Sequence, residues 1–393
     1  MWERANWSKK MRKAVNEMRI LHLADLHLGW RPSFLPPEKQ EEVQKERDRL
    51  LGWAVDYALD EKAAIDLVIV AGDLFETHRP PRELTERVIR DLARLEEAGI
   101  HLITVPGNHD EITYHDSVYR QEKERWPGLL VTNPQPRLVG TFSLRGTACY
   151  VYSMAYTGGI TGSLSPLTAF PREEAAGFHL AVFHGSYGRD GGERSLPLDP
   201  KGLAQAGYHY VALGHFHRRQ SYQLGAGLAM YPGIVYGKGF HDPGEGSFLV
   251  VDFSRPEPRT EIVPVEIRNF RSETVDVGLA ADAEELAEML MSRSDPRQLL
   301  ELRLTGLASF PLNGEEMEAR LAPYFYYLEV KDESVEYSRE SLERLAEEPT
   351  ITGIFLRRIL ARLQEAGDEG ERRLLHRALT KGLLALRGDG RSV

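Results

Sequence analysis

Cysteine is almost absent from the sequence: Cys149 is the only one among 393 residues. A single cysteine excludes an intramolecular disulfide and a metal cluster held by thiolates. Long apolar runs are missing too, since none approaches the roughly 20 residues that a membrane-spanning helix needs. Residues 1–17 are basic and polar and lack the apolar segment of a secretory signal, so we interpret them as an extension before Met18. These absences favour a cytoplasmic protein with no membrane attachment.

Positive charge is also in short supply, because 49 lysines and arginines face 59 aspartates and glutamates and give a net charge of −10. This balance argues against binding nucleic acid by bulk electrostatics. A local basic groove remains open, and bound divalent cations would add positive charge where a phosphate must lie. Five arginines near the motifs below are candidate phosphate contacts, although a solvated surface side chain is the default explanation for any one of them. They are Arg31, Arg79, Arg189, Arg218 and Arg219.

The chain is too long for one typical core, and its first 250 residues alternate buried strands with helices. That alternation predicts an α/β domain. Near-continuous aliphatic runs are typical of strands covered on both faces, and they occur at Ile20–Ala24, Asp66–Ala71, Leu102–Val105, Leu180–Phe183 and Tyr210–Leu213. Residues 41–59 and 83–97 have helical spacing. We expect Cys149–Ser153 and Ser247–Phe253 to form antiparallel hairpins of a second sheet.

Three regions follow from this pattern: a catalytic domain at 18–255, a small α+β domain at 265–335 and a helical tail at 340–393. The second region predicts strands at 274–277, 299–304 and 324–330 and helices at 282–291 and 314–321. The tail has apolar residues at helical spacing, which either pack back onto the body or present a surface for a partner helix. These residues are Ile354, Phe355, Ile359, Leu363, Leu374, Leu375, Leu379 and Leu383.

Five short motifs come directly after five of the predicted strands. They are ADLH at 24–27, GDLF at 72–75, GNHD at 107–110, HG at 184–185 and GHFH at 214–217. The carboxyl ends of neighbouring strands meet at one edge of a sheet, so we expect these carboxylates, imidazoles and one carboxamide to converge. A single histidine or asparagine in such a place is usually structural. Five motifs with metal-binding residue types make that explanation untenable for the whole set.

The spacing and chemistry of these residues predict a site for two divalent metal ions. Asp25 and His27 are two positions apart, as are His215 and His217, so each pair projects to one side of an extended segment. Oxygen and imidazole donors without thiolate suit manganese, iron or zinc better than calcium. Asp73 is the natural bridge between the ions. The predicted ligands are Asp25, His27, Asp73, Asn108, His184, His215 and His217.

Two such ions would lower the pKa of a bridging water and clamp phosphate oxygens for in-line attack, which predicts phosphoester hydrolysis. The departing alkoxide needs a proton. His109 is the candidate general acid or transition-state stabiliser, and Asp110 is expected to orient its imidazole and keep it protonated. A further metal ligand is the alternative role for His109. We expect Gly72, Gly107 and Gly214 to let the backbone turn behind the ligands.

In their order and composition, the five motifs resemble the calcineurin-like metallophosphoesterase superfamily. The segments RILHLADLHLG (19–29) and GDLF (72–75) are similar to its DNA-repair exonuclease branch, with the nuclease subunit of bacterial SbcCD and the YhaO-type exonucleases. This resemblance covers residues 18–253. It implies an α/β fold with a two-sheet sandwich flanked by helices, a small α+β capping domain and a helical C-terminal tail.

The resemblance also implies how the metals are shared. One ion would be held by Asp25, His27, Asp73 and His217, and the other by Asp73, Asn108, His184 and His215, with His109 acting on the leaving group. It further implies Mn²⁺ as the ion, DNA as the substrate, an SbcC-like coiled-coil ATPase bound by the C-terminal helices, and a homodimer. Archaeal and eukaryotic relatives carry a histidine three residues after the bridging aspartate, whereas Glu76 occupies that position here.

The leading hypothesis is therefore a two-metal DNA nuclease that works in DNA repair with an ATPase partner. A phosphodiesterase for a small nucleotide or sugar ester would share the metal site, but the extra domain and the tail favour a polymer substrate. A scaffold protein that only positions DNA is a third hypothesis, and the intact set of ligand residues argues against it.

Overall fold

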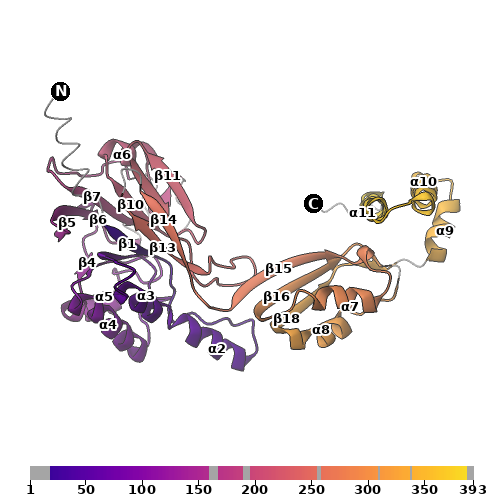
Figure 1. Cartoon of the computed structure of the whole chain (residues 1–393), viewed down its shortest axis with the longest axis horizontal. Helices are drawn as coiled ribbons and strands as arrows, with labels where there is room; N and C mark the ends of the chain where they lie inside the picture. Colours follow the sequence, from indigo (N-terminus) through magenta and orange to yellow (C-terminus); the bar gives the residue numbers. More distant parts are fainter. Residues whose placement is uncertain are drawn as a thin grey trace. The chain divides into compact units, whose positions relative to one another are not determined.

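The computed structural model divides into two compact units, one built from Met1–Lys238 with Gly244–Ile267 and the other from Gly239–Pro243 with the chain from Arg268 onward. The structure describes residues 18–158, 167–188, 195–254, 258–308, 310–336 and 339–386. Two six-stranded sheets form the first unit (Figure 1). None of the helices in these described ranges is both long and apolar enough to span a membrane.

The first sheet contains the three strands that precede the early motifs. In the order β14-β13-β1-β2-β3-β4, its strands are β14 (Arg259–Pro264), β13 (Ser247–Asp252), β1 (Arg19–Leu23), β2 (Leu67–Ala71), β3 (His101–Val105) and β4 (Leu129–Leu130). The strands from β1 to β4 are parallel, while β13 runs antiparallel to β1. The prediction that 247–253 belongs to the second sheet was therefore wrong. Five of the six residues of β13 are buried, and such a run does not indicate which sheet contains it.

The second sheet contains the strands that precede the two later motifs. In the order β11-β12-β10-β7-β6-β5, its strands are β11 (Gln220–Leu224), β12 (Gly227–Tyr231), β10 (Tyr210–Gly214), β7 (Phe178–His184), β6 (Thr147–Ser153) and β5 (Arg137–Leu144). The central pairs β6–β7, β7–β10 and β10–β12 are parallel. A short parallel pair, β8 (Ser186–Tyr187) and β9 (Pro197–Leu198), follows β7.

The two sheets pack face to face, because β2 contacts both β7 and β10. A buried hydrogen bond of 2.8 Å joins His22 Nδ1 on β1 to the hydroxyl of Tyr210 on β10. Burial lowers the pKa of His22 to about 3. The layers are therefore tied by a neutral polar contact as well as by apolar packing, and this fixes the edges from which the motif loops emerge.

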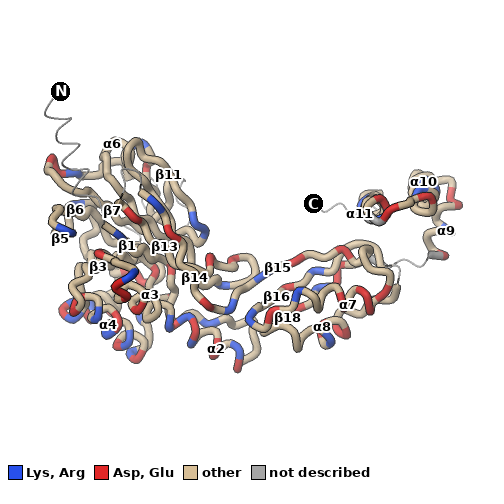
Figure 2. Tube along the Cα trace, viewed as in Figure 1, with Lys and Arg blue, Asp and Glu red and all other residues tan. Residues whose placement is uncertain are grey.

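Helices flank the first sheet, and α4 shows why they form. Its residues Leu84, Val88, Leu92 and Leu95 are buried at helical spacing, while acidic and basic residues are interspersed along the helix (Figure 2). The predicted helix at 41–59 is instead two helices separated at Asp48, whose carboxylate accepts the backbone N–H of Gly29 at 2.6 Å. The helices of the first unit are α2 (Pro37–Arg47), α3 (Leu50–Leu59), α4 (Arg82–Glu97), α5 (Val118–Gln121), η1 (Lys123–Arg125) and α6 (Pro200–Ala206).

The second unit begins as a three-stranded parallel sheet with two helices. Its strands are β15 (Asn269–Asp276), β16 (Asp295–Thr305) and β18 (Phe325–Asp332), and its helices are α7 (Ala283–Met291) and α8 (Gly314–Leu321). All five predicted elements are present, although the strand predicted at 274–277 overlaps only the end of β15, which begins at Asn269. The division between the units falls after Ile267 rather than at 255, because the segment up to Pro264 continues the first sheet as β14. Short elements complete the sheet region: η3 (Val277–Leu279), β17 (Leu307–Ala308), η4 (Ala322–Tyr324) and β19 (Val335–Glu336).

The tail forms three helices in its described part: α9 (Arg339–Glu347), α10 (Ile351–Glu365) and α11 (Glu369–Leu386). Most of the predicted apolar stripe is internal, since Ile359, Leu375 and Leu379 share a core with Leu307 of β17. Two positions of the stripe remain outside it, since Ile354 and Leu374 are 47% and 67% exposed. Two other tail residues, Ile351 and Leu386, are 75% and 38% exposed. The packing alternative is therefore correct for most of the stripe but not for Ile354 and Leu374.

Candidate metal centre

The motif loops after β1 and β2 run side by side beyond the ends of their strands. The backbone N–H groups of Asp25, His27 and Leu28 donate to the carbonyls of Gly72, Asp73 and Leu74 at 3.1, 3.0 and 2.9 Å. These bonds extend the register of the β1–β2 pair into the loops. The side chains of both motifs are thereby fixed relative to one another by backbone contacts alone.

Backbone strain is concentrated at the predicted ligands. Asp25, His27, Asp73 and His215 have φ angles of 54°, 47°, 50° and 111°. Side chains other than glycine rarely adopt such angles, and residues held there cluster at functional sites. The reasoning that placed Asp25 and His27 together because an extended segment projects alternate residues to one side was therefore wrong. Left-handed turns, rather than strand geometry, bring these side chains together.

Two glycines are required for space rather than for flexibility. A Cβ atom on Gly107 would lie 2.2 Å from Asp73 Oδ1, and one on Gly214 would lie 1.8 Å from the carbonyl oxygen of Ala71. The expectation of a sharp backbone turn holds only for Gly72, whose φ is 90°. Close approach of the loops is thus what demands the other two glycines.

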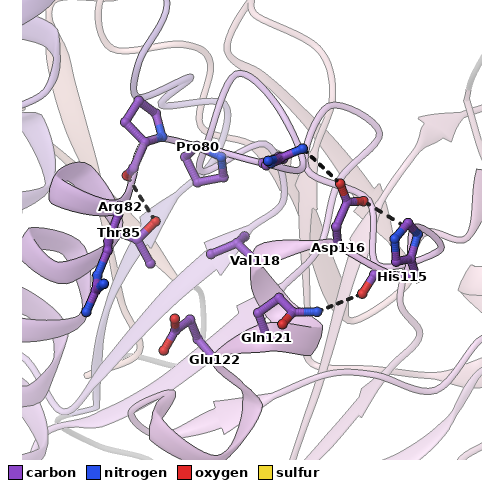
Figure 3. A pocket seen from close by; sticks show the side chains of 10 residues that line it. Pro80, Arg82, Thr85, His115, Asp116, Val118, Gln121 and Glu122 are labelled. Atoms are coloured by element: carbon purple, nitrogen blue, oxygen red, sulfur yellow. Dashed lines mark hydrogen bonds and ion pairs between the residues drawn. The ribbon is translucent and has the colours of Figure 1, made fainter.

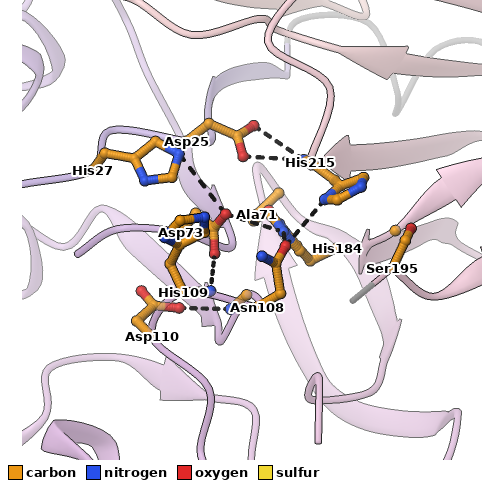
Figure 4. Close-up of polar contacts among 12 residues, drawn as sticks. Asp25, His27, Ala71, Asp73, Asn108, His109, Asp110, His184, Ser195 and His215 are labelled. Carbon is orange, nitrogen blue, oxygen red and sulfur yellow. Dashed lines mark hydrogen bonds and ion pairs between the residues drawn. The ribbon is translucent and has the colours of Figure 1, made fainter. Parts of the chain in front are cut away.

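One group of donors surrounds the amide of Asn108. Its Oδ1 lies 2.9 Å from His184 Nε2 and 3.0 Å from His215 Nδ1 (Figure 4). His184 Nδ1 lies 2.9 Å from the Ala71 carbonyl, to which it donates its hydrogen. In the neutral ring this leaves a lone pair on Nε2 that faces the lone pairs of the amide oxygen. A cation between them relieves that repulsion.

A second group surrounds His27. Its Nε2 atom lies 3.3 Å from His217 Nε2 and 3.8 Å from Asp73 Oδ2. The same Asp73 oxygen lies 3.4 Å from His184 Nε2, so this carboxylate reaches both groups. The ligand atoms of Asp25, His27 and His217 lie within 4.8 Å of one another, as do those of Asp25, Asp73 and His184. The structure thus brings all seven predicted ligands together, and their donor atoms fit divalent cations.

The carboxylates of this centre are deeply buried. Burial raises the pKa of Asp25 by more than the neighbouring His184 and His217 lower it. Burial also disfavours the charge on Asp73, but His184 and His27 outweigh it and hold the pKa of Asp73 below its usual range. For His184, burial is outweighed by the two aspartates, which raise its pKa to about 9. Without a bound cation, the neighbouring histidines, His184 first among them, favour the charge on Asp73.

The prediction that Asp110 contacts the His109 imidazole was wrong. Its carboxylate accepts the backbone N–H groups of Gly107 and Phe75 at 2.7 and 3.1 Å and the hydroxyl of Tyr119 at 2.7 Å. Burial, followed by the nearby charge of Asp73, raises its pKa to about 6. Asp110 therefore pins the loop that carries Asn108, because its side chain is directed into the protein behind that loop.

His109 lies at the open side of the centre, with 32% of its side chain exposed. Its backbone N–H donates to Asp73 Oδ1 at 2.8 Å, and its Nδ1 lies 3.2 Å from the carbonyl oxygen of Glu76. A hydrogen donated from Nδ1 to that carbonyl leaves Nε2 to exchange a proton with a ligand. His109 also has a ring nitrogen within 4.8 Å of ligand atoms of His27 and Asp73, which keeps the metal-ligand alternative open.

Three residues that the sequence did not single out for this centre lie behind His27. Glu76 Oε2 is 2.9 Å from His27 Nδ1 and 2.7 Å from the ammonium nitrogen of Lys238. The buried Arg47 donates to the carbonyls of Leu26 and Gly237 at 3.2 and 2.6 Å. Sequence reasoning noted Glu76 only as a departure from relatives. A charged residue within α2, Arg47, carried no signal that it would be fully buried.

The five candidate phosphate contacts have different surroundings. Arg31 and Arg218 are exposed, and Arg79 is exposed with an ion pair to Asp116 of 3.5 Å. Arg219 is half-buried and donates to Ser247 and the carbonyl of Pro232, which indicates a structural role. Arg189 lies outside the described residues.

A separate hollow of about 750 Å³ lies between the start of α4 and the segment that includes α5. Arg79, Thr85, Asp116 and Gln121 are among its lining residues (Figure 3). None of the predicted metal ligands or catalytic residues lines it. This hollow is therefore distinct from the centre formed by the five motifs.

Comparison of the sequence with known proteins agrees with a metal centre at this position. The family model for calcineurin-like phosphoesterases matches residues 18–219, which include all five motifs. The chain is 27% identical over 310 residues to the DNA double-strand break repair protein Mre11 of Sulfurisphaera tokodaii, covering 76% of each chain. It is 23% identical over 282 residues to the uncharacterized metallophosphoesterase YhaO of Bacillus subtilis, covering 70% of this chain and 67% of that protein.

A shorter match links the chain to the SbcD component of the SbcCD nuclease of Escherichia coli, with 36% identity over 95 residues, 24% of this chain and 22% of that protein. The family model spans more than half of the chain, and the motif residues that it includes converge in the structure. The protein is a member of the calcineurin-like phosphoesterase family.

Proposed function

We propose that this protein is a two-metal-dependent DNA nuclease that hydrolyses phosphodiester bonds in DNA repair. The position of Asp73 carries the proposal, because its Oδ2 atom lies within 4 Å of ring nitrogens from both donor groups. A carboxylate that reaches two sets of lone pairs is the ligand that a pair of adjacent cations shares. Hydrolysis of a phosphoester is the chemistry that such a pair supports in this family.

The two donor groups support a division of the ligands. Asp25, His27 and His217, with Asp73, would hold one ion; the distances among their donor atoms favour this set. Asn108, His184 and His215, again with Asp73, would hold the other, since the amide oxygen faces both rings.

When bound, the two ions would activate a water molecule and neutralise the charge on the phosphate. Within the chain, His109 would give the departing alkoxide its proton from Nε2 while the Glu76 carbonyl holds Nδ1. The P–O bond to the leaving group breaks as the water oxygen bonds to phosphorus. Asp110 would act at a distance, by holding the Asn108 loop rather than by contact with the reacting atoms.

DNA is the substrate that we favour, because two relatives that the chain resembles are named as a DNA double-strand break repair protein and a component of a nuclease. A second unit of more than 100 residues beyond the metal centre also suits a polymer substrate better than a small ester. The basic side chains of Arg31 and Arg218 remain available at the surface for the DNA backbone.

For the partner, we propose an SbcC-like coiled-coil ATPase that binds the exposed side chains Ile351, Ile354 and Leu374 of the tail. Replacing Ile354 and Leu374 by glutamate tests this contact, since neither side chain lies in the tail core. The double variant should stay folded and active on DNA but lose the ATPase in co-purification. The matched substitution of exposed Ile262, on β14, should leave it bound. Equal retention of the ATPase by the double variant would refute this part of the proposal.

We also propose that the protein is a homodimer, and light scattering would measure this.

The function is tested by metal content and by substrate. Elemental analysis of the purified protein should find two divalent ions per chain, and linear duplex DNA should be cleaved far faster than a chromogenic phosphodiester. Cleavage of the small ester alone would instead support a phosphodiesterase for nucleotides or sugar esters. Two bound metals without cleavage of either substrate would point to a scaffold protein.

Metal choice gives an independent test. After removal of the ions by a chelator, Mn²⁺ should restore activity far better than Mg²⁺, because four of the seven proposed ligands are imidazoles and Mg²⁺ favours oxygen donors. Equal rescue by Mg²⁺ would contradict the assignment of Mn²⁺.

A further inference from the structure

Behind the His27 ligand, a half-buried glutamate and a lysine form an ion pair that the metal-binding set does not use. We propose that Glu76 and Lys238 are a positioning pair that orients the His27 ring for its metal ion. This inference rests on the proposed two-metal function. It assigns a task to the position that distinguishes this chain from relatives with histidine there.

Contacts connect Lys238 to Glu76, and Glu76 to the ligand His27. The ammonium nitrogen of Lys238 lies 2.7 Å from Glu76 Oε2, and the same oxygen lies 2.9 Å from His27 Nδ1. His27 is completely buried, so bulk solvent does not reach its ring. A carboxylate beside Nδ1 keeps the hydrogen on that nitrogen and leaves the Nε2 lone pair for a metal. The Nε2 atom faces His217 and Asp73, as ligation requires.

Lys238 is itself held in place. The carbonyl of the preceding residue, Gly237, accepts from Arg47 at 2.6 Å. The Arg47 guanidinium stacks over the ring of Trp30 at 4.7 Å and also donates to the Leu26 carbonyl, between the two ligands of the first motif. One buried arginine thus joins the loop that carries Lys238 to the loop that carries His27. The loops near both members of the Glu76–Lys238 pair are therefore held by contacts within the protein, unlike those of an ion pair at an exposed surface.

Direct metal binding by Glu76 is the competing explanation. Among the described residues, the groups whose ligand atoms lie close enough to share a metal include His27 but not Glu76. Its other oxygen, Oε1, lies 3.8 Å from His109 Nδ1, and both His27 and Lys238 already contact Oε2. The carboxylate therefore lies beside the Nδ1 atom of His27 and the ammonium group of Lys238, on the far side of the His27 ring from the convergence of lone pairs.

The backbone of Glu76 contacts the other histidine, which makes a clean separation possible. The Glu76 carbonyl accepts from His109 Nδ1, whereas the side chain contacts His27. Substitution of the side chain should therefore weaken the metal site that contains His27 and leave the His109 contact in place. The two effects are measured by different quantities, affinity for metal and rate at saturating metal.

The experiment titrates the full-length, metal-free protein with Mn²⁺ alone by isothermal calorimetry. Glu76→Ala should weaken one of two Mn²⁺ sites by about 10- to 100-fold, as loss of an outer-shell carboxylate typically does. Glu76→Gln should recover part of the loss, because its amide oxygen can still accept from Nδ1. Lys238→Met should have a smaller effect of the same kind. The control Glu301→Gln changes a buried, ion-paired glutamate of the second unit and should leave both affinities unchanged.

Two results would overturn the inference: affinities within about twofold of the unsubstituted protein for both Glu76 variants, or equal weakening of both sites. If Glu76→Ala does not fold, Glu76→Gln and Lys238→Met decide the matter. The visible absorption of bound Co²⁺ adds a readout that reports ligand geometry; it should change in the Glu76 variants, change less in Lys238→Met and stay the same in Glu301→Gln. The unsubstituted protein decides the proposed function separately, because failure to bind two ions there would refute that function itself.

Discussion

Asp25 in the first unit and Glu301 in the second are both buried carboxylates, yet their charges are balanced in different ways. Glu301, which is 1% exposed, accepts from the Ser272 hydroxyl at 2.9 Å and from Arg303 at 3.1 Å and forms an ion pair with Lys331. Asp25 accepts the backbone N–H of His215. Within the described ranges, neither Asp25 nor Asp73 forms an ion pair with a lysine or arginine.

The two carboxylates differ in the source of the positive charge that balances them. A buried carboxylate needs an opposite charge, and Glu301 takes it from two side chains of its own sheet. At the centre of the first unit, the described part of the chain provides imidazoles and amides but no permanent cation beside the aspartates. This is the arrangement of a site whose positive charge arrives with a bound ion. The comparison can be tested in each unit by the following substitutions.

The largest effect is expected from Asp73→Asn. The variant should lose at least one metal and essentially all hydrolysis, because the Asp73 carboxylate is the group that reaches both sets of donors. His109→Ala is the matched comparison and should keep both metals while losing activity. Elemental analysis and a cleavage assay on the same samples distinguish the two. Loss of a metal in His109→Ala would instead assign that histidine as a ligand.

Metal removal should destabilise one unit selectively. An ion present at a thousandfold excess over its Kd contributes about 4 kcal/mol to the state that binds it. We therefore expect metal-free protein to show faster hydrogen exchange in β1 and β2 while β15 and β16 are unaffected. Mass spectrometry of exchanged peptides measures both units in one sample. An equal increase in hydrogen exchange in both units would contradict the idea that only the unit with Asp25 depends on a bound ion for its positive charge.

Glu301→Gln should produce the converse result. Removing the carboxylate leaves Lys331 and Arg303 with only their exposed partners Glu329 and Glu333 and should destabilise the second unit by about 1 kcal/mol. The pKa of Glu301 is lowered to about 2, because its ion pairs and hydrogen bonds outweigh the opposing effect of burial. A lowered folded-state pKa gives stability above the ordinary glutamate value, and that stability is lost as the pH falls toward 2. Acid unfolding of β15–β16 followed by exchange should show this loss in the unsubstituted protein and not in the variant.

The smallest effect on stability is expected for Asp25→Asn in metal-free protein. Burial raises the pKa of Asp25, so its charge opposes folding when no cation is present. The amide oxygen can still accept the His215 N–H, and the thermal midpoint should be unchanged or slightly higher. Differential scanning calorimetry measures it. A lower midpoint by several degrees would mean that the chain itself stabilises this charge.

The ligands could be predicted from sequence because each lies at the end of a buried strand or within four residues after it. Local patterns also located all five early elements of the second unit. The sheet that contains β13 could not be predicted, since its buried residues match either sheet. Arg47 and Gly237 are 190 residues apart, and nothing in the helical pattern of α2 marks an arginine that will be buried. Asp110 was misassigned because adjacency in sequence does not fix side-chain direction in a tight loop.

The two compact units are not separated by a single position in the chain. Residues Gly239–Pro243 belong to the second unit, although the chain then returns to the first for Gly244–Ile267. Phe240 in that excursion contacts the rings of Phe270 and Tyr327 at 5.7 and 6.4 Å. Dissection of the protein into independently expressed halves therefore has no clean cut. A fragment ending at 255 would lose the edge strand β14, and one ending at 267 would leave Phe240 without either aromatic neighbour.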